Sequence, residues 1–345
     1  MAQIDKPSLH FNTKLYTGTG SAQNITGVGF QPDWVWTKQR SGTEHHNSND
    51  AVRGATKVIF PNLNNAEQTV SNLITGFVSD GFSVGDNAGA NNNGSTYASW
   101  NWKAGTAFTN DASSTGIGTI DSSGRVNTAA GFSICSWVGT GSNGTIKHGL
   151  STVPEIMIIK NTGHDTNWSV YTKPTGELGE MRLNTTDAFT DDATLYNDTA
   201  PTSSVFSVGT NYNTNHSDGR TYIGYIFSSV KGYSKIGSYT GNGNSSGDGA
   251  FIYLGFKPAF FMVKNVSASG HGWYMFDNKR DVDNPTNKYL VANTTAADAS
   301  FDWMDFNSNG IKVRGNSGGA NNSGETYIYM AIAEEPLVAN VGASI

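Results

Sequence analysis

Residues 91–102 read NNNGSTYASWNW, an asparagine-rich turn followed by a run that opens on Thr-Tyr. The same pattern returns twice, as NHSDGRTYIGYIF at 215–227 and NNSGETYIYMAI at 321–332. Asn and Gly favour turns because they tolerate left-handed backbone, whereas aromatic and β-branched residues favour strands. Each copy is therefore predicted to be a turn that leads into a β-strand.

Three further landmarks precede this strand in every copy, and they keep the same order. They are YTGTG (16–20), WVGTG (137–141) and YTGNG (239–243); GFQPDWVWTK (29–38), GLSTVPEIMIIK (149–160) and GFKPAFFMVK (255–264); and FSVG (82–85), FSVG (206–209) and IKVRG (311–315). Landmarks that recur in order are the signature of an internal repeat. The sequence therefore predicts three copies of a unit of about 100 residues, the size of a β-sandwich domain.

The positions of the landmarks set the boundaries. We define unit one as residues 14–105, unit two as 132–232 and unit three as 233–336. Outside them lie an N-terminal arm (1–13), a Gly/Ser/Thr-rich linker (106–131) and a C-terminal tail (337–345). The predicted fold class is all-β, with three tandem antiparallel β-sandwich repeats of jelly-roll or lectin-like type.

Composition narrows the functional classes. Only 14% of the residues are charged and 11% are aromatic, which argues against disorder. The net charge of −6 and the absence of a Lys/Arg run predict no nucleic-acid binding. The single cysteine predicts no internal disulfide, and no apolar stretch reaches the roughly 18–20 residues of a membrane span. Because no apolar signal segment is visible at the N-terminus, we expect synthesis in a cytoplasm and no membrane insertion.

Two tryptophan pairs, Trp34 with Trp36 and Trp100 with Trp102, suggest either a sugar-stacking platform or a core. In PDWVWTK (32–38), Trp34 and Trp36 are two residues apart and lie on one face of a strand. When the units are aligned, Ile156 and Phe260 stand opposite Trp34, and a sugar platform has no reason to become Ile. The pairs are therefore predicted to fill the sandwich core. Three lysines also correspond, and we expect solvated strand-end residues at Lys38, Lys160 and Lys264.

An Asp-x-x-Arg pattern occurs in two of the three units. Asp50 and Arg53 in unit one are matched by Asp277 and Arg280 in unit three. Unit two has Thr172 in place of the acid and no Arg. Because a catalytic pair would hardly lose both members in one copy, structural ion pairs are the predicted role.

Catalytic and metal motifs are weak. DFNSNG (305–310) resembles the start of a calcium loop, but its twelfth position is Asn316 instead of an acid, so a hairpin turn is the better interpretation. His45 and His46 lack a third ligand at a usual spacing. No G-x-S-x-G motif appears, and Cys135 lies in an apolar strand pattern. We therefore expect no metal, no cofactor and no catalytic residues. A pair of carboxylates of the glycosidase type is defined by a distance in space, so a sequence motif does not reveal it.

The asparagine-rich turns are the candidate binding surface. Amide side chains both donate to and accept from hydroxyl groups, as recognition of a glycan requires. The candidates are Asn91, Asn92, Asn93, Asn213, Asn215, His216, Asn321 and Asn322. The competing interpretation is that Asn occupies these positions only because it suits turns.

A family resemblance is carried by the stretches YTGTG…ITGVGFQPDWVWTK…DAVRGATK, FVSDGFSVG, NNNGSTYASWNWKAG and GFSICSWVGTGSNGTIKHGL. In these stretches the chain resembles a family of repeat-containing virion structural proteins. These tail-fibre-like proteins come from tailed phages of marine bacteria, and the resemblance extends from about Lys14 to Pro336. It implies a virion component and carries no catalytic residues.

Together these observations predict a non-enzymatic protein of the virion surface. The expected role is a tail fibre or other appendage that contributes to host adhesion. The alternatives are a capsid decoration or head-fibre protein and a carbohydrate-active depolymerase. Expected partners are other virion proteins, a host-surface glycan or protein receptor, and further copies of the chain, for example in a trimer. The arm (1–13) is a hypothetical docking segment, because it lies outside the repeats.

Overall fold

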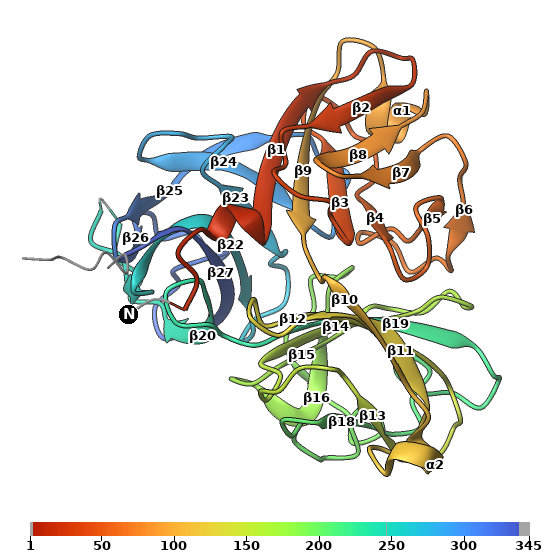
Figure 1. Ribbon diagram of the computed structural model, residues 1–345. Coiled ribbons are helices and arrows are strands. Elements are labelled where there is room, and N and C mark those ends of the chain that lie inside the picture. The colour runs from red at the N-terminus through yellow and green to blue at the C-terminus, as the bar shows by residue number, and fades with distance from the viewer. Residues whose placement is uncertain (1–2, 246, 338–345) are drawn as a thin grey trace, which may run out of the picture.

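The chain folds into antiparallel β-sheets with very little helix. The computed structural model describes residues 3–245 and 247–337 (Figure 1). Strands take up 45% of the residues and helices 3%. This confirms the prediction of an all-β chain, and it agrees with a composition rich in turn-forming and strand-forming residues.

Unit one contains two main sheets. Their strand orders are β1-β9-β3-β4 and β2-β8-β7, and a β5-β6 ladder lies beside them. The strands are β1 (Phe11–Thr17), β2 (Gln23–Thr26), β3 (Trp34–Gln39), β4 (Asn47–Asp50), β5 (Lys57–Val58), β6 (Gln68–Thr69), β7 (Ile74–Val78), β8 (Gly81–Val84) and β9 (Thr96–Trp102), with helices η1 (Pro7–Leu9) and α1 (Ala88–Asn91).

Unit two has one large sheet and one small sheet. The large sheet has the order β10-β11-β12-β19-β14-β15-β16-β17, and the small one pairs β13 with β18. The strands are β10 (Thr106–Asn110), β11 (Ser122–Asn127), β12 (Phe132–Val138), β13 (Gly144–Lys147), β14 (Ile156–Asn161), β15 (Ser169–Thr172), β16 (Gly176–Arg182), β17 (Thr190–Asp191), β18 (Val205–Val208) and β19 (Thr221–Phe227), with α2 (Ala112–Thr115) after β10.

Unit three is built on one curled sheet. Its order is β20-β27-β22-β23-β24-β25-β26-β21. The strands are β20 (Ser234–Thr240), β21 (Phe251–Tyr253), β22 (Phe256–Asn265), β23 (Tyr274–Asp277), β24 (Thr286–Val291), β25 (Ala299–Asn307), β26 (Gly310–Val313) and β27 (Thr326–Pro336). A hairpin turn is present in DFNSNG, but it lies one residue before the Asn309-Gly310 turn that the sequence predicts, because Asn307 pairs with Gly310 across the β25-β26 hairpin.

One four-strand order occurs in every unit. It is β1-β9-β3-β4 in unit one, β12-β19-β14-β15 in unit two and β20-β27-β22-β23 in unit three. The registers also correspond: Trp34 pairs with Trp102, Ile156 with Phe227, and Phe260 with Ile332. The sequence alignment of the units is therefore matched by their strand pairing.

The segment predicted to be a linker is part of the unit-two sheet. The linker (106–131) instead forms β10, α2 and β11, and β11 pairs along β12 at the edge of the unit-two sheet. Its few apolar side chains, Phe108, Ile120 and Val126, pack on the unit-two core, so its Gly/Ser/Thr composition reflects edge strands instead of a connector. The proposed tail (337–345) lies outside the described residues except for Leu337.

The N-terminal arm is also not free. Ile4, Pro7 and Phe11 are buried, Phe11 opens β1, and the amide of Gln3 donates to the carbonyl of Lys231. The described part of the arm therefore packs against the rest of the chain. Its hypothetical docking role loses its structural basis, because the apolar side chains are already used internally.

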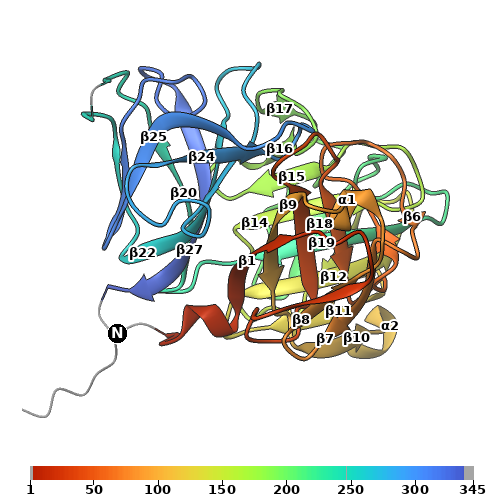
Figure 2. The same cartoon turned by 90° about the horizontal axis from the view of Figure 1, so that it is seen from above.

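A shared core joins the three units. The residues of β3 alternate, so Val35 faces the inside of unit one, whereas Trp34 and Trp36 face a cluster to which all three units contribute. Trp34 stacks on Tyr225 of unit two at 4.0 Å between ring centroids, and Phe11 lies 5.5 Å from Phe260 of unit three. Figures 1 and 2 show unit three, in cyan and blue, as a lobe beside the other two. The tryptophans are core residues, as predicted, but they fill the space between units and not the inside of a sandwich.

We predict that Trp34→Ala destabilises all three units together. Removing a buried indole should lower the free energy of unfolding by about 3–5 kcal/mol, since the site borders rings of two units. Calorimetry should still show one transition, and hydrogen exchange should accelerate in unit-three peptides as well. The control Val138→Ala, at a 51% exposed site, should change stability by no more than about 0.5 kcal/mol. Two separate transitions, only one of them shifted, would contradict the shared core.

Candidate functional site

One side-chain N–H in each unit reaches a backbone carbonyl of another unit. The donors stand immediately before β4, β15 and β23, and the contacts are His46 Nε2 to Val291 O (3.2 Å), Trp168 Nε1 to Phe60 O (3.1 Å) and Trp273 Nε1 to Arg182 O (2.9 Å). His46 Nδ1 accepts from Trp36, so its proton is on Nε2. Burial lowers the pKa of His46 well below its ordinary value and keeps the ring neutral.

Backbone hydrogen bonds repeat the same connections. The amide of Glu67 donates to Thr162 O at 2.9 Å, which joins unit one to unit two. The equivalent bonds run from Phe189 N to Val266 O (3.1 Å) and from Asp298 N to Arg40 O (2.8 Å). Unit one therefore contacts unit two, unit two contacts unit three, and unit three contacts unit one, so the contacts close into a ring.

Both predicted ion pairs are present, and each lies at a junction between units. Asp50 and Arg53 are 2.6 Å apart, as are Asp277 and Arg280, and these side chains are at most 5% exposed. Asp50 accepts a hydrogen bond of 2.7 Å from the Tyr225 hydroxyl of unit two. Asp277 accepts one of 3.1 Å from Trp100 Nε1 of unit one. Each carboxylate therefore accepts hydrogen bonds both from its own turn and from the neighbouring unit.

Unit two, which lacks the ion pair, shows why the Asp-x-x-Arg pattern is not present in every unit. In unit two, Thr172 and Thr175 stand in place of the pair, with their hydroxyl oxygens 2.9 Å apart. Unit three has Met330 where the other units carry Trp100 and Tyr225. A hydroxyl pair does not need a buried donor opposite it, whereas a buried carboxylate does. The sequence alignment places Trp100 and Tyr225 at equivalent core positions but misses their hydrogen bonds to Asp277 and Asp50, although the three positions vary together with the ion pair.

The three corresponding lysines are buried, which corrects the expectation of solvated strand ends. Lys38 donates to Gln39 O and Gly42 O at 2.6 and 3.0 Å, Lys160 to Asn161 O and His164 O at 2.7 and 3.0 Å, and Lys264 to His271 O. Each ammonium group closes the loop that leads to the next strand. Burial lowers the pKa of Lys38 and Lys264 to about 8 and that of Lys160 to about 7.

Three of the candidate binding residues are structural. Asn91, Asn215 and Asn321 are fully buried. Their Oδ1 atoms accept from Thr19 N, Thr140 N and Asn242 N, and their Nδ2 atoms donate to the carbonyls of Gly85, Gly209 and Gly315. These amides are used in fixing the turns, so a ligand-binding role for the three residues is corrected.

The other candidates are dispersed around these turns. Asn92 and Asn93 are exposed, and Asn322 is half-buried. Asn213 is buried and donates to Glu180 at 3.1 Å. His216 stacks on Tyr212 with ring centroids 3.5 Å apart. The turns belong to three different units, and the structure does not gather them into one site.

Other chemistry-bearing groups have structural surroundings. Within residues 3–245 and 247–337, no group of three or more His, Cys, Asp or Glu side chains is placed to hold a metal. Burial raises the pKa of the Cys135 thiol far above its usual range. None of the helices in the described chain has the length and hydropathy needed to cross a bilayer.

A family model described as a domain of unknown function, DUF7483, matches residues 6–336. The chain belongs to this family. No curated protein and no solved structure matches it. The DUF7483 match spans all three units and the segment between the first two, as expected if the units are inseparable parts of one structure.

We predict that Tyr225→Phe lowers the free energy of unfolding by about 1–3 kcal/mol, because buried Asp50 loses a hydrogen-bond donor from the neighbouring unit. The phenyl ring keeps the stacking on Trp34, so the change isolates the hydroxyl. Urea unfolding measures the effect, and Tyr212→Phe, at a half-exposed ring, is the control. Equal stability of the two variants would show that the contact between the units contributes nothing.

A second prediction concerns pH. The pKa of Lys160 is about 7 when folded, because of burial, against 10.5 ordinarily, so the unfolded chain binds more protons between these values. The free energy of unfolding therefore rises with pH in this window. Lys160→Met should reduce that slope by up to about 1.4 kcal/mol per pH unit, measured by urea unfolding at pH 7, 8 and 9. Exposed Lys231→Met is the control, and an unchanged slope in Lys160→Met would refute the assignment.

Proposed function

We propose that this protein is a non-enzymatic structural component of a tailed-phage particle, placed in a tail fibre or other surface appendage where it contributes to host adhesion. The resemblance of its repeat landmarks to virion proteins supports this role. The observation that carries the proposal is the closed ring of contacts between units, because such a block bears load without separating its parts.

The use of the buried polar groups supports a structural role. Carboxylates, amides and ammonium groups that are fully buried make hydrogen bonds within turns or between units, as Asp50, Asn91 and Lys160 do. Buried charges are costly unless they are paired, so their repeated use at junctions indicates selection for a defined arrangement. This pattern favours a scaffold over a catalyst.

We further propose that the three units are copies of one antiparallel sandwich of jelly-roll or lectin-like type. Their common four-strand order and matching registers support this. Because the units already bury a shared core inside one chain, the proposal does not need a homotrimer to supply it. Partner copies and other virion proteins would then attach at outer surfaces.

A capsid decoration protein is the second candidate. The observation that favours it is the threefold recurrence of the contacts between units, since such a block suits a threefold position on a shell. The depolymerase alternative gains less support. A hollow of about 530 Å³ in unit three has no Asp or Glu among the described residues that line it, whereas glycoside cleavage needs two carboxylates.

Antibody labelling of intact particles under the electron microscope tests the proposal. We expect label on tail fibres or the tail tip, together with saturable adsorption of purified protein to host cells. Label over the head would replace adhesion with decoration as the function. Absence of label from every particle, with abundant protein in infected cells, would overturn the virion assignment.

A further inference from the structure

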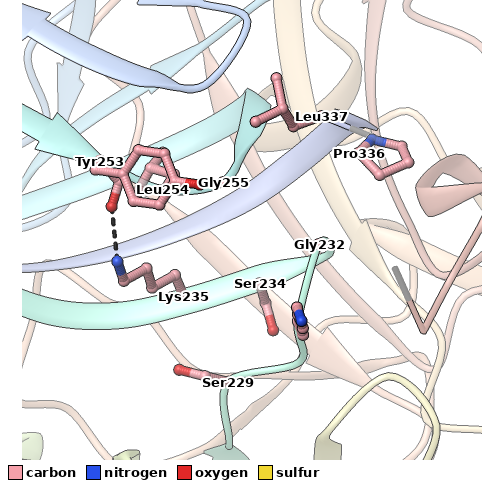
Figure 3. Close-up of a pocket in the computed structure, with 10 residues that line it drawn as sticks. Ser229, Gly232, Ser234, Lys235, Tyr253, Leu254, Gly255, Pro336 and Leu337 are labelled. Atoms are coloured by element: carbon pink, nitrogen blue, oxygen red, sulfur yellow. Dashed lines mark hydrogen bonds between the residues drawn. The ribbon is translucent and has the colours of Figure 1, made fainter. Parts of the chain in front are cut away.

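The hollow lies between the two outermost strands of the unit-three sheet, and the last residues of unit two complete its lining. β20 and β21 stand at opposite ends of the strand order, and the cavity of about 530 Å³ opens between them. Figure 3 shows Lys235 of β20 reaching towards Tyr253 of β21, with Leu337 at the far side. Lys235 Nζ donates to Tyr253 O at 2.6 Å, so the ammonium group bridges the two edges.

Aromatic side chains are exposed on β21. Phe251 is 48% and Tyr253 55% exposed, whereas Ile252 between them is buried in the unit-three core. Because side chains alternate along a strand, the two rings lie on the same outer face. Paired exposed rings beside a cavity are a surface feature that usually marks a binding site.

The sister units show that the fold does not require these rings. Ile252 pairs with Ile311 just as Ile25 pairs with Phe82 and Ile146 with Phe206, which aligns the three strands. At the positions of Phe251 and Tyr253, unit one has Asn24 and Thr26, and unit two has Thr145 and Lys147. A buried isoleucine in each unit's own core recurs in all three units, but at the two flanking positions aromatic rings occur in unit three alone.

Comparison with the sister units also explains why the hollow is larger and more polar at Ser234. Ser234 pairs with Ile332 in the register in which Phe11 pairs with Trp102 and Phe132 with Phe227. A hydroxyl therefore lines the hollow where the other units carry a buried phenylalanine. The loss of that ring removes bulk at the mouth of unit three.

Positive charge lies beside the exposed ring. Lys235 Nζ is 5.5 Å from the centroid of Tyr253, and its one hydrogen bond to protein leaves two of its three N–H donors for a ligand. Exposed Lys231 lines the same hollow, and the lining residues in the described chain include no carboxylate. An anion entering the hollow would meet two ammonium groups.

We propose that this hollow binds an anionic saccharide unit. The C–H face of the sugar packs on Tyr253, and its carboxylate or sulfate group accepts hydrogen bonds from Lys235 and Lys231. Ser229 and Ser234 also line the hollow, but their hydroxyl groups already donate to Glu155 and to Ser228 O, so recognition of the anionic group rests on the two lysines. The inference rests on the proposed adhesion function, for which it names the ligand class and the site.

Calorimetric titration of the full chain tests the site with three tetrasaccharides of equal length: uronic-acid, sulfated and neutral glucose. We expect the two anionic probes, or one of them, to bind at least about ten-fold more tightly than the neutral one. The better anionic probe identifies the acid group. No binding of either anionic probe, or equal binding of all three, would overturn the proposal.

Two variants locate the site. Tyr253→Ala should weaken anionic binding by about ten-fold or more, and Lys235→Met should remove the preference for anionic over neutral probes. Tyr212→Ala, which removes an equally exposed ring in unit two, should bind as the parent does. Thermal unfolding of each variant checks that the fold persists. Undiminished binding by folded Tyr253→Ala would refute this location.

Adsorption to host cells separates this inference from the proposed function. If the parent adsorbs and Tyr253→Ala adsorbs equally well, adhesion survives and the site is refuted. If the site binds anionic saccharides in vitro but virions carry no label, the site stands and the virion role falls. Loss of both saccharide binding and cell adsorption in Tyr253→Ala alone would support both.

Discussion

The shared apolar core between the three units is the constraint on which the rest of the structure depends. Trp34 stacks on Tyr225 of unit two, and Phe11 lies against Phe260 of unit three, so another unit contributes to the burial of each side chain. Each of the four-strand sheets therefore has two buried faces. A sheet buried on both faces has no solvated side, which explains the continuous run of buried residues in β3 and β14.

Burying both faces makes an unpartnered polar group at a junction costly. The carbonyl groups that accept from His46, Trp168 and Trp273 belong to neighbouring units. The backbone bonds join the same pairs of units but donate in the opposite sense around the ring. Single-chain closure gives these contacts a high effective concentration, since the partners cannot diffuse apart. Apolar packing supplies the stability and the polar contacts fix the arrangement of the units, so a chain without disulfides remains well defined.

The repeats, the strand class and the ion pairs were predictable because they leave local patterns in the sequence. The position of the shared core was not predictable. The size and apolar character of Trp34 indicate that it is buried, but they do not show whether its own unit or a neighbouring unit packs against it. Lys160 looked solvated, since a sequence does not show the carbonyl groups that surround an ammonium group. The segment 106–131 looked like a connector because edge strands tolerate the same Gly, Ser and Thr residues that linkers use.

Comparison among the units separates structural residues from functional candidates within one chain. Asn91, Asn215 and Asn321 recur at the same position, and each makes the same hydrogen bonds, so the shared fold accounts for them. Tyr253 has no aromatic counterpart in the sister units, yet its ring is 55% exposed and lies beside the Lys235 ammonium group. Since a ring that is 55% exposed adds little packing to the fold, it is consistent with the proposed ligand site. In repeat proteins, the positions at which one copy departs from its sisters are therefore where a binding site should be sought.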